Sequence, residues 1–191
     1  MTERRKRIIV GISGASGIIY GVRMLELLRA SGVETHLVVS KAAEMTLAYE
    51  SELTLKDLRG MADHFHPMGD IGASISSGSF HTLGMAIAPC SIRTMSEIAT
   101  GVTGSLMSRA ADVVLKERRR LVLAVRETPL HSGHLRTMLQ LSEMGAVICP
   151  VVPAFYNKPK TLDDIVNHTV GRILDLFDIE VGAVKRWKSQ E

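Results

Sequence analysis

Glycines at positions 11, 14 and 17 follow the first apolar run of the chain and open a helical pattern. Backbone N–H groups at such a helix start, together with the helix dipole, attract anions such as phosphate. The spacing differs from the G-x-G-x-x-G of dinucleotide-binding folds, and G-x-x-x-x-G-K-[ST] occurs nowhere, which disfavours NAD and nucleoside triphosphates. The stretch Gly11 to Gly17 therefore predicts either a phosphate site or a tight turn whose glycines only permit packing.

Two further polar turns follow predicted strands. Ser40 stands where an NAD-binding protein offers a carboxylate to the ribose, so serine suits a mononucleotide better, although an N-cap role is favoured for Ser40 alone. The turn Ser91-Ile92-Arg93-Thr94 lies at the C-terminal end of another predicted strand, the edge at which open α/β sheets bind ligands. Its hydroxyl and amide groups could hold a ring or a phosphate, or could simply cap a helix.

The pair Arg126-Glu127 directly follows the predicted strand Leu121 to Val125 and precedes Thr128-Pro129. A cation and a carboxylate at the ligand-binding edge of the sheet suit an acid or base. An adjacent Arg-Glu pair is usually a surface feature, but its place at a strand exit before proline favours a functional role.

Other charged and aromatic residues carry weaker signals. Arg109, Asp112 and Lys116 are spaced by three and four on one predicted helix and can face one side, where a solvated ion-pair stripe is the favoured interpretation. The remaining three, taken singly, indicate packing or surface roles: Tyr156, Arg172 and Trp187.

We expect no catalytic metal. The pairs His64/His66 and His131/His134 each lack a third ligand at usable spacing, so capping or surface roles are favoured. Asp163-Asp164 does not form the repeated Asp-rich pattern that diphosphate-using prenyl enzymes place around magnesium. The two cysteines are far apart and form no C-x-x-C motif, so neither a disulfide framework nor a zinc site is expected.

The elements that must position these residues alternate between strand and helix from end to end, the pattern of a doubly wound α/β fold with one parallel sheet and helices on both faces. We expect strands over Arg7–Ile12, Val33–Val39, Gly84–Pro89, Leu121–Val125 and Ala146–Ile148. We expect helices over Ile18–Ala30, Lys41–Glu50, Ser91–Thr100, Ser105–Arg118 and Leu135–Met144, and a last helix opened by the capping-box-like Thr161-Leu162-Asp163-Asp164.

The segment Leu53 to Gly78 is the hardest to assign. Its Ile75-Ser76-Ser77-Gly78-Ser79 is too small and polar for a core and suits a loop closing over a ligand. With no repeat or low-complexity linker in 191 residues, we expect a single domain spanning residues 1–191.

Composition excludes several classes of protein. The formal net charge of +3 and the two short basic runs are too little for a nucleic-acid-binding stripe. No apolar stretch reaches the roughly 18 residues of a membrane helix. The basic start before Ile8 imitates a secretory signal, but Gly11, Ser13 and Gly14 interrupt the apolar region, so we expect a cytoplasmic protein.

Taken together, these segments resemble the flavin prenyltransferase family, the UbiX-like enzymes once described as aromatic acid decarboxylases. Several motifs in the same order carry the resemblance, which covers about Arg7 to Phe177: Val10 to Gly17, Val39 to Ala43, Ile75 to Phe80, Pro89-Cys90-Ser91, Arg109 to Arg118, Arg126 to Leu130 and Pro153 to Tyr156. Arg120 and the stretch Leu135 to Met138 depart from the family pattern, which puts subunit contacts in doubt more than the reaction.

The resemblance implies a transfer of a dimethylallyl group from dimethylallyl monophosphate to reduced FMN, first at N5 and then at C6, without a metal. The residues that it implies for FMN binding are Gly14, Ala15, Ser16, Ser40, Ser91, Ile92, Arg93, Thr94 and Arg126. Those implied for catalysis are Glu127 for proton transfer, with Ser16, Lys116 and Tyr156. Those implied near the prenyl phosphate are Tyr156, Arg172, Lys116, Arg109, Glu50 and Trp187.

These residue types suit the reaction. Fixed cations help an anionic phosphate to leave, aromatic faces such as Tyr156 and Trp187 stabilise an allylic cation, and a carboxylate can accept the proton that leaves C6. The resemblance further implies a homo-oligomer, a dodecamer, in which Tyr156 and Arg172 complete a neighbour's site. It also implies that a separate UbiD-type decarboxylase receives the prenylated FMN, for ubiquinone synthesis or aromatic acid breakdown.

Two alternatives remain open. An FMN-dependent decarboxylase of the related cysteine-decarboxylase type shares the fold but needs a catalytic histidine and does not need the cluster Arg109, Lys116 and Arg172. A non-catalytic flavin carrier would leave the flavin covalently unchanged.

Overall fold

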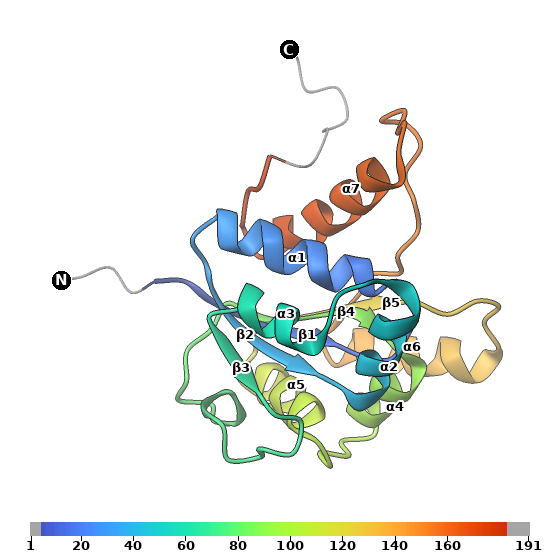
Figure 1. The fold of residues 1–191 in the computed structure, drawn as a ribbon. Helices are drawn as coiled ribbons and strands as arrows, with labels where there is room; N and C mark the ends of the chain where they lie inside the picture. Colours follow the sequence, from blue (N-terminus) through green and yellow to red (C-terminus); the bar gives the residue numbers. More distant parts are fainter. Residues whose placement is uncertain (1–4, 183–191) are drawn as a thin grey trace.

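The structure of the protein is a computed structural model, described here for residues 5–182. Its centre is a six-stranded, all-parallel sheet in the order β3-β2-β1-β4-β5-β6 (Figure 1). The strands are β1 Arg7–Ile12, β2 Glu34–Val39, β3 His64–His66, β4 Gly84–Cys90, β5 Arg120–Val125 and β6 Val147–Ile148. The helices are α1 Ile18–Ala30, α2 Lys41–Glu50, α3 Leu55–Met61, α4 Ile92–Ala99, α5 Leu106–Lys116, α6 Ser132–Glu143 and α7 Leu162–Asp175, with a 3₁₀ turn η1 at Ser74–Ser76.

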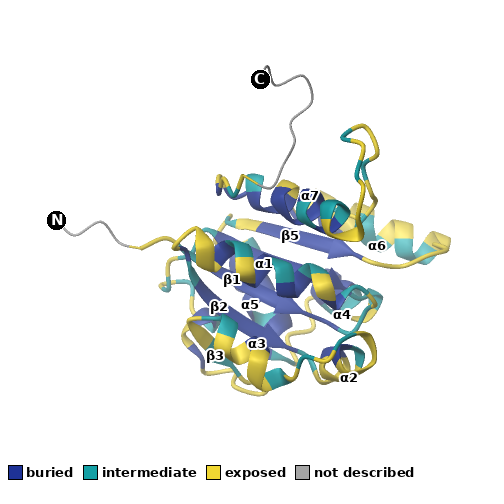
Figure 2. Cartoon of the chain, turned by 45° about the horizontal axis from the view of Figure 1, so that its top comes forward, coloured by how far each residue is buried: buried dark blue, intermediate teal, exposed yellow. Residues whose placement is uncertain are grey.

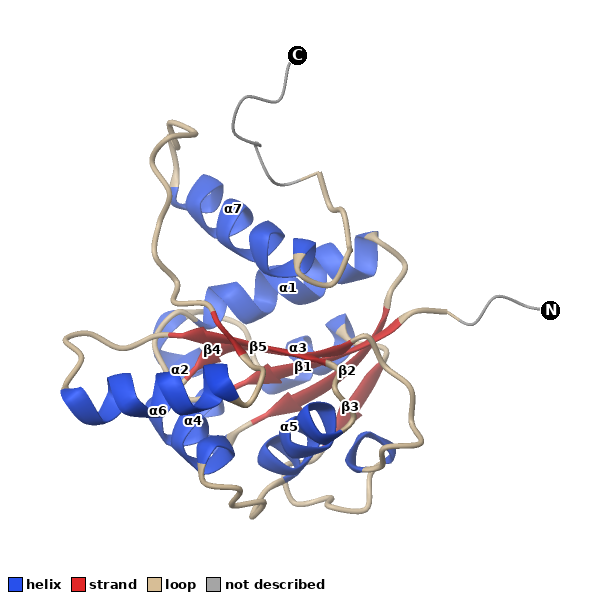
Figure 3. Cartoon of the chain, turned by 180° about the vertical axis from the view of Figure 1, so that it is seen from behind, coloured by secondary structure: helices blue, strands red, loops and turns tan. Residues whose placement is uncertain are grey.

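The central strands are buried on both faces, and their side chains alternate between two cores (Figure 2). In β1, Ile8 and Val10 face the core beneath α1, α2, α3 and α7, whereas Ile9 faces the core beneath α4, α5 and α6. The view from behind shows α1 and α7 on one side of the sheet and α4, α5 and α6 on the other (Figure 3). This doubly wound arrangement confirms the predicted fold class.

The predicted strands and helices outside Leu53 to Gly78 are all present, with end positions that differ by up to three residues. Within that segment, α3, β3 and η1 were not predicted. The expectation that the stretch Ile75 to Ser79 lies outside the core is wrong for Ile75, because the Ile75 side chain is 1% exposed and packs in the core beneath α5. The neighbouring Ser74 and Ser77 are exposed, so a single apolar side chain anchors an otherwise polar loop to the core.

The edge strand β3 also changes the surroundings of the histidines. It pairs in parallel with β2, with His36 opposite His64 and Val38 opposite His66. The expectation that His64 and His66 lack a third possible ligand is therefore wrong, because Glu34 and His36 lie beside His64.

Between residues 5 and 182, no helix combines the length and the apolar character that crossing a membrane requires.

Candidate functional site

The direction of strand succession reverses between β1 and β4, so the loops after these neighbouring strands lead to helices on opposite faces of the sheet. Open α/β sheets bind ligands in the crevice formed at such a point. Ser13, which is fully buried, joins the two loops: its hydroxyl donates to the Pro89 carbonyl at 2.9 Å and accepts from the Ser91 N–H at 2.8 Å. Ser13 is thus a site-building residue that the sequence did not single out.

The glycine-rich stretch after β1 is shaped by close packing and by backbone conformation. A Cβ placed on Gly14 would lie 2.3 Å from the Ala42 Cβ, so only glycine lets this loop contact the start of α2. Gly17 has a φ of 99°, in the left-handed region that glycine adopts without strain. Close packing at Gly14 and the left-handed backbone at Gly17 therefore both require glycine in this turn.

The N-terminus of α1 already has an anionic partner. The Glu50 carboxylate accepts from the N–H groups of Gly17 and Ile18, each at 2.9 Å from Oε2. Burial acts to raise the pKa of Glu50, but hydrogen bonds from Ser16, Ile18 and Gly17 outweigh it and hold that pKa below its ordinary value. The anion that this helix start attracts within the chain is Glu50 itself, next to Ser16.

The helices that follow β2 and β4 begin at the same edge of the sheet. The Ser40 hydroxyl accepts from the Ala43 N–H at 3.1 Å, and the Ser91 hydroxyl accepts from the Thr94 N–H at 3.3 Å. Both serines are therefore N-caps of α2 and α4. Arg93 extends away from this turn, with a side chain that is 87% exposed and paired with Glu97.

A cleft of about 920 Å³ opens at this edge, between the start of α1, the end of β5 and the start of α7. Its polar wall contains Ser16, Arg126 and Glu127, three of the predicted site residues. Its apolar wall contains Ile19, Tyr20, Val125, Leu130, Pro150, Val151, Val152, Pro153, Leu162, Ile165 and Val166. The volume lies in the range of small-molecule and cofactor sites, and a largely apolar wall with few polar groups is typical of them.

Arg126 and Glu127 reach the cleft because β5 ends at Val125. The Arg126 N–H donates to the Cys90 carbonyl at 3.1 Å, which fixes the turn against β4, and the Arg126 charge contributes to the lowered pKa of Glu50. Glu127 is exposed, and its carboxylate accepts from the Thr128 N–H at 3.0 Å. Ser16, Arg126 and Glu127 therefore line one part of the cleft, and Glu50 lies behind Ser16 and within electrostatic reach of Arg126.

Two predicted site residues lie on α5, outside this cleft. Arg109 pairs with Asp112 at 2.9 Å, as the ion-pair interpretation predicted, whereas Lys116 pairs with Glu117 at 2.5 Å. Lys116 ends α5 and is followed by β5, so it lies near the edge of the sheet where strands begin. The cleft is at the opposite edge.

Two more lie on or near α7. The Tyr156 hydroxyl lies 3.1 Å from Nε2 of His168, a residue that is 5% exposed and that the sequence did not single out. Arg172 donates to Asp175 at 2.7 Å and is half exposed. Neither Tyr156 nor Arg172 lines the cleft in the described chain. Trp187 lies outside the described residues.

Tyr20 is a further cleft residue that the sequence did not identify. It lies on the first turn of α1, and burial raises the pKa of its phenol. Its position three residues after Gly17 is the signal that could have revealed it, because the first turn of the helix must face the ligand edge.

Comparison with known proteins gives consistent results. The family model described as Flavoprotein matches residues 1–174. The flavin prenyltransferase UbiX of Escherichia coli K12 is 62% identical over 175 residues, which are 91% of this chain and 93% of that protein.

Two solved structures are similar over nearly the whole chain. A crystal structure of AnUbiX (PadA1) in complex with FMN and dimethylallyl pyrophosphate has a TM-score of 0.96 and 49% identity, and covers 98% of this chain and 100% of that one. A dodecameric FMN-dependent Ubix-like decarboxylase from Escherichia coli O157:H7 has a TM-score of 0.93 and 49% identity, with 96% and 100% covered. The cysteine decarboxylase TvaF, at 17% identity and a TM-score of 0.61, is similar in fold alone.

Proposed function

The chain belongs to the flavin prenyltransferases of the Flavoprotein family, and from this premise we propose that it transfers a dimethylallyl group from dimethylallyl monophosphate to reduced FMN. The product is FMN carrying the prenyl group at N5 and C6, with release of phosphate. The observation that supports this assignment most strongly is the cleft in which Ser16, Arg126 and Glu127 meet beside an apolar wall. The similar AnUbiX structure holds FMN and a dimethylallyl ester together.

FMN in this proposal lies across the ends of β1 and β4. Its phosphate accepts from N–H groups at the starts of α2 and α4, near Ser40 and the turn Ser91 to Thr94, since Glu50 already fills the start of α1. Its ring system lies along Gly14-Ala15-Ser16 and Arg126 and extends into the cleft. Reduced flavin supplies the nucleophilic N5 and C6 atoms; the chain orients them and excludes water.

Glu127 is the proposed proton acceptor for ring closure. Glu127 lines the cleft next to Arg126, so its carboxylate can contact a ligand bound in the cleft. Loss of a proton from C6 must accompany formation of the second bond, and a carboxylate within reach is suited to take it. Tyr20, on the same cleft wall, offers an aromatic face to the allylic cation, the role also proposed for Tyr156.

The cations for the departing phosphate come, in this proposal, from other copies of the chain. Lys116 lies at the far edge of the sheet from the cleft of its own chain, and Arg109 and Arg172 are also outside that cleft. A homo-oligomer that places these residues and Tyr156 at a neighbour's cleft would complete the site. The dodecameric relative supports such an assembly.

We extend the proposal to the surroundings of the reaction. The whole chain is one FMN-binding unit that works in the cytoplasm and passes prenylated FMN to a UbiD-type decarboxylase. No step needs a metal, because basic side chains can neutralise a monophosphate. The similar AnUbiX structure contains dimethylallyl pyrophosphate, whereas we propose the monophosphate as the substrate. The rates measured with the two esters should therefore be compared directly.

The alternatives are less well supported. A cysteine-decarboxylase type of enzyme needs a catalytic histidine, and there is none among the described residues that line the cleft. A flavin carrier needs no proton-transfer carboxylate at the cleft mouth.

One experiment tests both the reaction and the shared site. The E127Q and K116A variants are purified separately, then dissociated and reassembled together, and phosphate release from dimethylallyl monophosphate with reduced FMN is measured with and without a chelator. At a dimethylallyl monophosphate concentration well below the raised KM of K116A, we expect each variant alone to be nearly inactive and the mixture to recover activity, unaffected by the chelator. Carbon dioxide release from aromatic acids by the chain alone would contradict the proposal, as would phosphate release that stops on chelation.

A further inference from the structure

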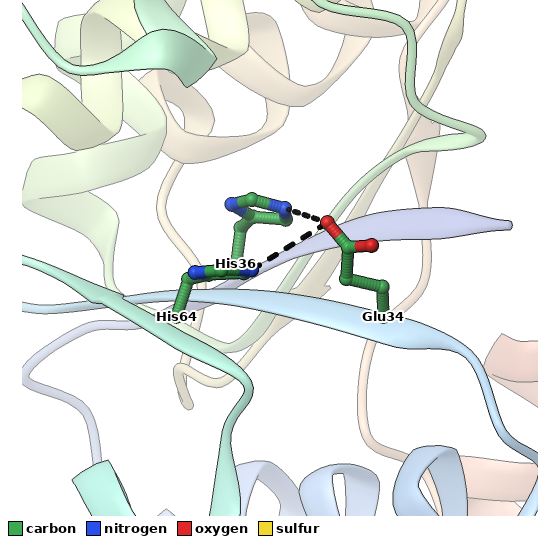
Figure 4. Close-up of side chains that lie close together, drawn as sticks. All are labelled: Glu34, His36 and His64. Atoms are coloured by element: carbon green, nitrogen blue, oxygen red, sulfur yellow. Dashed lines mark hydrogen bonds and ion pairs between the residues drawn. The ribbon is translucent and has the colours of Figure 1, made fainter. Parts of the chain in front are cut away.

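A cluster of imidazole and carboxylate side chains lies on strands β2 and β3, on the face of the sheet that also carries Val38. Glu34 and His36 are two residues apart on β2 and so project from the same face, and His64 is opposite His36 on β3 (Figure 4). Nothing in the proposed reaction uses these residues. Glu34 and the strand starts lie at the edge of the sheet opposite the cleft.

The ligand atoms of this cluster converge. The Glu34 Oε1 atom lies 3.0 Å from His36 Nε2 and 3.6 Å from His64 Nε2, and the three atoms all lie within 4.8 Å of one another. Zinc binds imidazole nitrogen and carboxylate oxygen at about 2.0–2.2 Å in a tetrahedron, which separates its ligand atoms by roughly 3.3 Å. A small movement of His64, whose side chain is 54% exposed, brings the set to that spacing.

A fourth residue orients the buried member of the set. His36 is 4% exposed, and its Nδ1 atom lies 3.0 Å from His66 Nε2. If Nε2 of His36 binds a metal, Nδ1 must carry the proton and donate it to His66 Nε2. A histidine ligand whose second ring nitrogen donates to a fixed acceptor is the arrangement usual in metal sites. A metal ion bound between Glu34 Oε1 and His36 Nε2 would take the place of the proton that these two atoms share in their hydrogen bond.

One cation competes for the same carboxylate. Arg7 lies 2.9 Å from Glu34 Oε1 through its Nε atom, and its guanidinium also lies over the Phe80 ring. The negative charge of Asp70 also acts on His66 and favours its protonated form. Arg7 therefore weakens metal binding, because it hydrogen-bonds to Glu34 Oε1 and adds positive charge. The other carboxylate oxygen of Glu34, Oε2, stays available to a metal ion.

We propose that Glu34, His36 and His64 bind one divalent transition-metal ion, with Zn²⁺ the best match to two imidazoles and a carboxylate, and with water as the fourth ligand. β3 pairs with β2 at only three positions, so an ion held by both strands joins the edge strand to the sheet. The site is structural and does not take part in prenyl transfer.

The test is titration of the metal-free full-length protein with ZnCl₂ by calorimetry. The H64Q variant removes one exposed ligand, and H81Q is the matched control because His81 is also exposed and lies outside the cluster. We expect one Zn²⁺ per chain, affinity at least tenfold weaker in H64Q, and no change in H81Q. We also expect tighter binding in R7Q, which frees Glu34 Oε1; a purely hydrogen-bonded cluster would not gain metal affinity from that change.

Co²⁺ substitution checks the ligand type. When Co²⁺ is bound in place of Zn²⁺, we expect the visible absorption bands of tetrahedral Co²⁺. We expect no near-ultraviolet charge-transfer band, because the proposed ligands include no thiolate. Equal Zn²⁺ binding by wild-type and H64Q proteins, no saturable binding, or a thiolate band from a cysteine site would overturn the proposal. Flavin prenylation is measured in the same samples, and we expect it to be unchanged in H64Q, so that failure of the metal site is distinguishable from failure of the proposed function.

Discussion

Replacing Glu50 with Gln tests how the start of α1 is stabilised. The Glu50 carboxylate accepts hydrogen bonds from Gly17, Ile18 and Ser16 at the positive end of the helix dipole. A charge at this position contributes about 0.3–1 kcal/mol, and a hydrogen bond to a charged group about 1.5 kcal/mol or more when buried. Because Glu50 is exposed and Gln keeps one accepting oxygen, we expect the E50Q protein to lose about 1–2 kcal/mol of unfolding free energy at pH 7.

The dependence on pH follows from the direction of the pKa shift. The pKa of Glu50 is lower in the folded protein than in the unfolded chain, so its contribution is complete above the unfolded pKa of about 4.5. The contribution is lost as the pH falls through the lower, folded pKa. Wild-type and E50Q proteins should therefore differ at pH 7 and converge in acid.

The assay is urea unfolding at fixed protein concentration, repeated at intervals from pH 7 downward, with E52Q as the control because Glu52 is a neighbouring exposed carboxylate. Equal unfolding free energies of wild-type and E50Q proteins at pH 7 would refute the capping role. So would a difference that stays constant into acid, or an equal loss in E52Q.

The remaining predictions concern the proposed site. E127Q should bind FMN normally and form product about 100-fold more slowly, as for loss of an acid/base group; wild-type turnover would remove Glu127 from that role. K116A and R172A should each raise KM for dimethylallyl monophosphate while the spectrum of bound FMN stays unchanged, and loss of FMN would contradict the assignment. G14A should lose about 1–3 kcal/mol of stability and bind FMN more weakly, since its Cβ would overlap Ala42; unchanged urea unfolding would refute that packing argument.

The strands and helices of this fold were predictable where the sequence carries a long and regular pattern. The runs that became β1, β4 and β5 are nearly continuous in apolar residues because both faces of those strands are buried. β3 was missed because His64-Phe65-His66 is three residues long and lies at an edge. α3 was missed although Thr54 and Asp57 form a capping box, since Gly60 weakens the helical pattern.

Site residues were predictable where they directly follow a strand, because the end of the strand fixes their position in the fold. Arg126 and Glu127 follow β5, so the parallel sheet alone places them at the ligand edge. The contact of Glu50 with Gly17 joins residues 33 apart and has no local signal. The place of Lys116 could have been predicted, because α5 runs back along the sheet for 11 residues, roughly 16 Å. Its cation must therefore lie far from the cleft of its own chain.

The metal-binding cluster could not be predicted without β3, because Glu34 and His36 are separated from His64 by about thirty residues and come together only through strand pairing.

The central claim is that this chain joins a dimethylallyl group to FMN. The most direct measurement is the mass of the flavin released from the purified protein after incubation with reduced FMN and dimethylallyl monophosphate, without added metal or partner protein. We expect a flavin heavier than reduced FMN by one C₅H₈ unit, formed in wild-type protein and nearly absent in E127Q. Recovery of unmodified FMN from fully loaded, folded wild-type protein would contradict the account and favour a flavin carrier.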